Sequence, residues 1–95
     1  MERVSYIFKK RIKKGWLKMS IVIKTNKTED VILINKKITE LGLEVDAKRG
    51  RYNVDANSIM GLLSLDFSQG VELVIHETNK KSSIDELINF LQKYI

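Results

Sequence analysis

Hydrophobic and polar residues alternate along four short segments of the chain, each with the length of one β-strand. In residues 20–25, Ile21 and Ile23 lie on one side of an extended chain, and Val22 and Lys24 lie on the other. The same alternation recurs in residues 43–47, 51–54 and 71–76. Because successive side chains of a strand point to opposite faces, this pattern predicts four half-buried strands.

Two longer segments repeat their apolar residues at the spacing of an α-helix. The first runs from Thr28, a predicted N-cap, to Gly42, which is predicted to end the helix. Its apolar positions are Val31, Ile34, Ile38 and Leu41. In the second, Ser83 and Glu86 have the spacing of a capping box. Its apolar stripe comprises Ile84, Leu87, Ile88, Leu91 and Tyr94. Both segments are therefore predicted to be helices with one buried face.

A shorter apolar segment, residues 58–65, lies between the third and fourth predicted strands. Asp55 and Asn57 precede it and are capping candidates. We therefore predict a short helix whose weakest position is Gly61, since glycine is a poor helix former.

The order of these elements predicts the fold class. Arg49-Gly50 is predicted to turn the second strand into the third, which gives the order β-α-β-β-α-β-α. Such an α+β chain is expected to place three helices on one face of a four-stranded antiparallel sheet. The predicted apolar seam between the two layers comprises Ile21, Ile23, Ile34, Ile38, Val45, Leu73, Ile75, Leu87, Ile88 and Leu91.

The positive charge of the chain is concentrated in residues 1–18. The net charge is +5, and this segment contains seven of the 17 Lys and Arg residues but one of the 12 acidic residues. Residues 19–95 are nearly neutral, so no nucleic-acid binding is expected of them. We interpret residues 1–18 as a basic leader that contributes nothing to the core, either disordered or preceding a true start at Met19. The alternative is an amphipathic helix with an apolar stripe of Val4, Phe8, Ile12 and Trp16.

The composition excludes several kinds of site. The chain has no cysteine and one histidine, so it forms no disulfide and no metal site built from thiolates or several histidines. No apolar run approaches the roughly 20 residues of a membrane-spanning helix, and no secretory segment is recognisable. We therefore expect a cytoplasmic protein without a metal or a cofactor. No nucleophile has a recognisable base beside it, which predicts that the protein is not an enzyme.

One run of residues is more specific than the order of elements. The run Ser58-Ile59-Met60-Gly61-Leu62-Leu63-Ser64-Leu65 follows the third predicted strand and precedes a glycine turn, Ser68-Gln69-Gly70, into the fourth. It resembles the corresponding segment of the HPr family, the histidine-containing phosphocarriers of the bacterial sugar phosphotransferase system. The resemblance implies the HPr-like open-faced β-sandwich of that family, with the order of elements predicted above.

The resemblance also implies two roles for this run. Ser58 would be the serine that HPr kinase/phosphorylase phosphorylates in carbon catabolite regulation, at a helix start that favours a phosphate. The alternative is that Ser58 is only a helix cap. Ile59, Met60 and Leu63 would form an exposed apolar patch that binds partner proteins, and the alternative is that they are buried under the sheet.

The chain departs from the family at the residue that carries the phosphoryl group. Family members have a histidine in a Gly-Leu-His-x-Arg-Pro-Ala run between the first strand and the first helix. Here Lys27 and Thr28 occupy that position, and neither can replace an imidazole nucleophile near neutral pH. The single histidine, His76, ends the fourth predicted strand and is interpreted as an exposed strand-end residue.

The resemblance and this departure together identify the chain as a variant that lacks the active-site histidine, similar to the catabolite-repression HPr homologue. We expect a non-catalytic, regulatory protein with protein partners: HPr kinase/phosphorylase, a transcriptional regulator or an enzyme of the phosphotransferase system. One alternative function is a phosphocarrier that uses an unrecognised acceptor. Another is a protein associated with membranes or nucleic acid through its basic leader.

Overall fold

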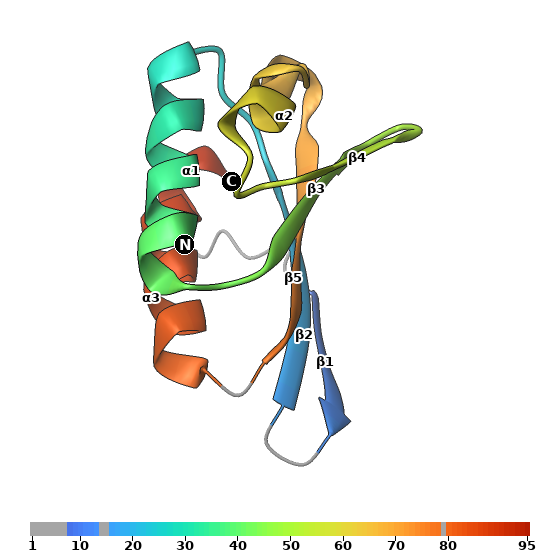
Figure 1. Cartoon of the computed structure of the whole chain (residues 1–95), viewed down its shortest axis with the longest axis vertical. Helices are drawn as coiled ribbons and strands as arrows, with labels where there is room; N and C mark the ends of the chain where they lie inside the picture. The colour runs from blue at the N-terminus through green and yellow to red at the C-terminus, as the bar shows by residue number, and fades with distance from the viewer. Residues whose placement is uncertain (1–7, 14–15, 79) are drawn as a thin grey trace.

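The helices of the described part of the chain lie on one face of its sheet, as Figure 1 shows. The computed structural model describes the backbone of residues 8–13, 16–78 and 80–95. Within them, the strands are β1 (Phe8–Lys13), β2 (Trp16–Ile23), β3 (Val45–Arg49), β4 (Tyr52–Asp55) and β5 (Val71–Thr78). The helices are α1 (Thr28–Leu41), α2 (Ile59–Leu63) and α3 (Lys81–Leu91), with 3₁₀ turns at Phe67–Gln69 and Gln92–Tyr94.

The predicted α+β architecture is confirmed, and one strand is added to it. The elements from β2 to α3 follow the predicted order, and the sheet order is β1-β2-β5-β3-β4 with every neighbouring pair antiparallel. The four predicted strands are β2, β3, β4 and β5. The prediction of four strands omitted β1, which pairs with the outer edge of β2. None of the described helices is long and apolar enough to cross a membrane.

The strand β1 corrects one interpretation of the basic leader. An amphipathic helix is wrong for Phe8–Lys13, because this segment pairs with β2 from Phe8 opposite Ser20 to Lys13 opposite Trp16. Without β1, the edge of β2 would present unpaired N–H and C=O groups, and an extended segment satisfies them where a helix would not. Val4 lies outside the described residues. That residues 19–95 are a domain on their own stays a prediction.

The core lies between the sheet and the two longer helices. Cross-strand partners on the inner face, such as Ile21 and Leu73, are fully buried. Nine residues of the predicted seam are buried, and the tenth, Ile88, is half-buried at the edge of the core. Residues that the sequence analysis did not place in the seam also line it, among them Met19, Ala47, Ala56, Leu62, Val71 and Ile84. The alternation of apolar and polar residues therefore identified the buried face of the sheet correctly.

The helix starts differ from the predicted caps. Lys27, not Thr28, is the N-cap of α1, and the hydroxyl of Thr25 accepts a hydrogen bond from the Lys27 N–H at 3.2 Å. The helix α3 begins at Lys81, so Ser83 lies inside its first turn and the predicted capping box is wrong. The predicted end of α1 is confirmed, because Gly42 has φ 67°, a left-handed conformation that glycine adopts readily.

A truncation in α3 tests the core. Leu87 is fully buried, so Leu87→Ala removes apolar contacts and leaves a cavity that costs about 2–5 kcal/mol of unfolding free energy. The matched control is Leu33→Ala in α1, where the side chain is 45% exposed and little contact is lost. Urea denaturation measures both variants. A loss at Leu87 no larger than that at Leu33 would show that the seam is misplaced.

Candidate protein-binding site

The short helix α2 exposes two of its four apolar side chains to solvent. Met60 is 76% exposed and Leu63 is 42% exposed, whereas Leu62 is fully buried and attaches the helix to the core. Ile59 is half-buried. The alternative that these residues are buried under the sheet is therefore wrong for Met60 and Leu63. We call Ile59, Met60 and Leu63 the α2 patch.

Ser58 is the N-cap of α2 and is exposed. Its Oγ accepts a hydrogen bond from the Gly61 N–H at 3.2 Å, so the cap that the sequence allowed is present. Gly61 also has a steric role, because a Cβ there would lie 3.2 Å from the Cβ of Val54 and 3.4 Å from the Ser58 Oγ. The weakest helix former in α2 is thus the residue that lets the helix approach β4.

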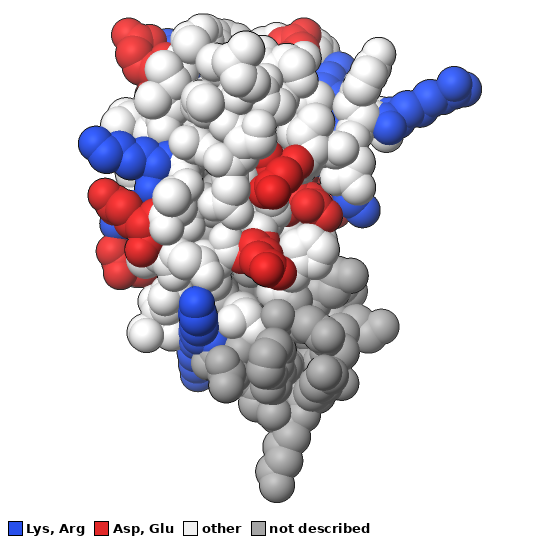
Figure 2. Space-filling view, in the orientation of Figure 1, with Lys and Arg blue, Asp and Glu red and all other residues white. Residues whose placement is uncertain are grey.

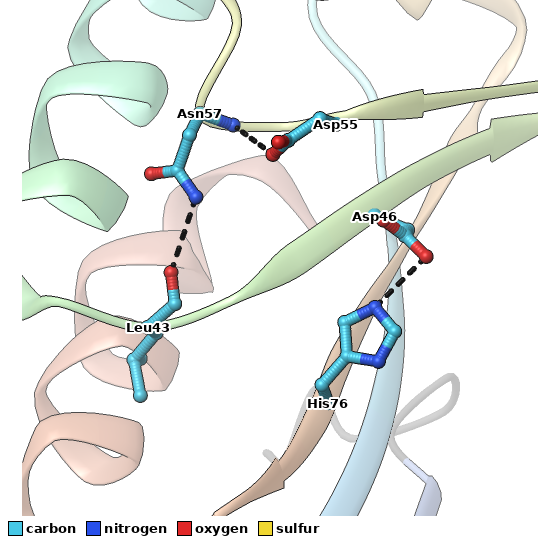
Figure 3. Close-up of polar contacts among 5 residues, drawn as sticks. All are labelled: Leu43, Asp46, Asp55, Asn57 and His76. Carbon is cyan, nitrogen blue, oxygen red and sulfur yellow. Dashed lines mark hydrogen bonds and ion pairs between the residues drawn. The ribbon is translucent and has the colours of Figure 1, made fainter.

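Asparagine side chains attach the turn before α2 to α1 and to the loop that leads into β3. Asn35 of α1 donates from its amide to the Ala56 carbonyl at 2.9 Å. Asn57 donates from its side chain to the Leu43 carbonyl at 3.3 Å, and its backbone N–H donates to the Asp55 carboxylate at 2.9 Å (Figure 3). A helix of one or two turns is marginal by itself. These contacts therefore fix where Ser58 and the α2 patch lie.

The first turn of α1 contains a carboxylate that accepts two hydrogen bonds from hydroxyl groups. Asp30, in the first turn, accepts hydrogen bonds from the Thr25 hydroxyl at 2.6 Å and the Tyr94 hydroxyl at 3.3 Å. Burial, and then the negative charge of Asp30, raise the pKa of Tyr94, so its hydroxyl keeps the proton that it donates. A carboxylate at this end interacts favourably with the helix dipole and opposes a second anion. Lys27 and Thr28 therefore lie beside an anion that is already in place.

The start of α1 and the end of α2 line the same cavity. It has a volume of about 300 Å³ and is lined by Lys27, Thr28 and Val31 from α1 and its N-cap, by Leu63 from α2, and by Phe67 after it. Lys27 and Thr28 thus line the same cavity as Leu63 of the α2 patch. Spacing along the sequence gave no sign of this proximity, because it depends on the packing of the two helices.

His76 lies away from this surface and has a partner that the sequence did not reveal. Its Nε2 lies 2.9 Å from a carboxylate oxygen of Asp46 on β3 (Figure 3), and its side chain is 44% exposed. Asp46 is opposite Asp55 in the β3–β4 ladder, so the His76 ring lies beside one of two neighbouring carboxylates. His76 is only partly exposed, and β5 continues past it to Thr78, so it is not the exposed strand-end residue that was predicted. Its contact with Asp46 could not be predicted without the strand register. Within the described residues, no three His, Cys, Asp or Glu side chains are placed to hold a metal ion.

Comparisons with known proteins give one informative likeness. No family model matches the chain, and a search of curated proteins finds no match. A search of solved structures finds the crystal structure of HPr-C-His from Thermoanaerobacter tengcongensis, with a TM-score of 0.62 and 22% sequence identity. The match covers 79% of this chain and 90% of the other. The chain therefore has an HPr-like fold.

Removal of the Ser58 hydroxyl tests the cap. Ser58→Ala leaves the Gly61 N–H without its side-chain acceptor, so we expect a loss of about 1 kcal/mol in unfolding free energy. Ser82→Ala is the matched control, because Ser82 is an exposed serine inside α3. Thermal or urea denaturation compares the two. Equal stability of Ser58→Ala and the parent chain would show that the cap does not form in solution.

Proposed function

We propose that this chain is a non-catalytic, HPr-like regulatory protein of the sugar phosphotransferase system family that binds other proteins in the cytoplasm through the α2 patch. Phosphorylation of Ser58 switches that binding. The observation that carries the proposal is the exposure, on one short helix, of a serine hydroxyl and two large apolar side chains, Met60 and Leu63. Its HPr-like fold and the resemblance of residues 58–65 to HPr sequences support the choice of family.

The hydrogen bonds of three nearby serines favour Ser58 as the modified residue. The hydroxyl of Ser64 donates to the Gly61 carbonyl at 2.6 Å, and that of Ser68 donates to the Asp66 carboxylate at 2.6 Å. The Ser58 hydroxyl acts as an acceptor instead, and among the described residues it donates to no partner. Its proton can therefore be removed, and its oxygen can attack a phosphoryl group, without breaking a donor contact.

A phosphate at Ser58 would alter the surface next to the α2 patch and leave the core as it is. It adds about −1.5 to −2 charges at neutral pH, and its oxygens form strong hydrogen bonds with arginine side chains. Asp55, three residues earlier, adds a further negative charge, although one of its oxygens is held by the Asn57 N–H. A partner with an apolar surface beside a basic one would therefore distinguish the two forms. HPr kinase/phosphorylase, a transcriptional regulator and a phosphotransferase-system enzyme are the proposed partners.

The start of α1 supports a role without phosphoryl transfer. Lys27 and Thr28 stand where the family histidine would be, and the Asp30 carboxylate is held beside them by two hydroxyl groups. A phosphoryl group that arrived there would meet this negative charge in place of a free helix end. His76 lies in a different element, on β5, where it is paired with Asp46.

Phosphorylation by a kinase tests the switch. The full chain is incubated with HPr kinase/phosphorylase and ATP, and the modified residue is identified by mass spectrometry. We expect one phosphate on Ser58, no label on Ser58→Ala, and full labelling of Ser64→Ala. Met60→Ala should keep its stability but be labelled more slowly, because its exposed side chain would contact the kinase.

Labelling of Ser64 or Ser68 while Ser58 stays unmodified would contradict the proposed switch. An unlabelled chain would leave Ser58 as a helix cap alone. Unchanged kinetics in both Met60→Ala and Leu63→Ala would remove the α2 patch from the docking site.

A further inference from the structure

A second surface lies at the tip of the β3–β4 hairpin and is lined by none of the three residues of the α2 patch. The hairpin extends outward from the body of the domain (Figure 1), and its turn residue Gly50 has φ 60°. Beneath the tip is a hollow of about 510 Å³. Arg49, Arg51 and Tyr52 line it on the hairpin side, and Ser64, Leu65 and Asp66 line it on the side of the segment after α2.

Two of the charged groups in this hollow are already engaged. Arg49 donates from its guanidinium to the Gly70 carbonyl at 3.2 Å and to the Gln69 carbonyl at 3.4 Å. Asp66 accepts from the hydroxyl of Ser68 at 2.6 Å and from its N–H at 3.1 Å, and these bonds, with the nearby charge of Arg49, lower the pKa of Asp66. Asp66 is therefore ionised at neutral pH, and Arg49 offsets its charge.

Arg51 and Tyr52 remain without partners. Tyr52 is 70% exposed and Arg51 is exposed, and within the described residues neither side chain has a hydrogen bond, an ion pair or a ring contact. Lys48, also exposed, adds a third positive charge to the hairpin besides those of Arg49 and Arg51. Figure 2 shows Lys and Arg side chains at the outer end of the hairpin and Asp and Glu side chains nearer its base. Arginine and tyrosine are the residue types that most often dominate binding energy in protein interfaces.

We infer that this hollow binds an acidic, extended peptide segment of a partner protein. The guanidinium of Arg51 would pair with a carboxylate of the segment through two parallel hydrogen bonds. Tyr52 would lie along the peptide and exclude water, and the hollow would take an apolar side chain against Leu65. The site uses neither Ser58 nor the α2 patch, so substitutions in the two sites can be tested separately.

Charge favours a peptide over a nucleic acid here. The net charge of residues 19–95 is close to zero, and the ladder that carries the hairpin also holds Asp46 and Asp55 opposite each other. A polyphosphate backbone that crossed the hairpin would meet these carboxylates. A short acidic segment, in contrast, can bind through the single guanidinium of Arg51 and through contacts with the other residues that line the hollow.

Amide chemical shifts of the ¹⁵N-labelled full chain test the inference. The probe is a short synthetic peptide in which glutamate alternates with leucine, and its control has glutamine in place of glutamate. We expect the glutamate peptide to shift the amides of residues 49–52 and 64–66 and to lose affinity as salt is added. Arg51→Ala and Tyr52→Ala should each weaken binding by about tenfold or more. Lys36→Ala, which removes an exposed positive charge from α1, should leave the affinity unchanged.

Several results would overturn the inference. These are no shift in residues 49–52, equal binding of the glutamine peptide, or an equal loss of affinity in Lys36→Ala. Shifts confined to the α2 patch would also overturn it, because the peptide would then bind elsewhere. If single-stranded oligothymidylate shifts residues 49–52 and the glutamate peptide does not, the surface binds nucleic acid instead.

Discussion

The fold depends on the burial of one face of the sheet. Inward-pointing residues of the central strands, such as Ile21, Leu73 and Val45, can leave water only if α1 and α3 cover them. Each buried aliphatic side chain contributes roughly 1.5–3 kcal/mol, so this seam supplies most of the stabilisation. Within α2, only Leu62 is buried in the core, and Ala56 in the turn before the helix is buried with it. The rest of α2 is therefore free to present Ser58, Met60 and Leu63 at the surface.

The same packing decides what the start of α1 can do. Tyr94, near the end of the chain, packs into the core and reaches Asp30 with its hydroxyl, while Thr25 holds the other carboxylate oxygen. The electropositive end of α1 is thus supplied with an anion from within the protein. This anion beside Lys27 and Thr28 supports our proposal that the chain acts through contact between proteins and not through phosphoryl transfer.

Sequence patterns predicted the sheet, the long helices and the seam because these follow from local periodicity and burial. These patterns failed for features that depend on contacts between residues far apart in the sequence. The start of α3 at Lys81 was not predicted, because Ser83 and Glu86 have the spacing of a capping box. The strand β1 was not predicted either, because its sequence has no strand periodicity and its pairing depends on the free edge of β2. The exposed patch and Ser58 were found only through a resemblance to HPr sequences. The pair of His76 with Asp46, and the cavity between α1 and α2, depend on register and packing that the sequence does not display.

We propose that this HPr-like chain works without taking a phosphoryl group from enzyme I of the phosphotransferase relay, so that Ser58 is modified only by a kinase. The most direct measurement is incubation of the full chain with enzyme I of the phosphotransferase system and labelled phosphoenolpyruvate, beside an HPr that has its histidine. We expect label on the control protein and none on this chain. Stable transfer of label to this chain, on His76, Lys27 or any other residue, would contradict it.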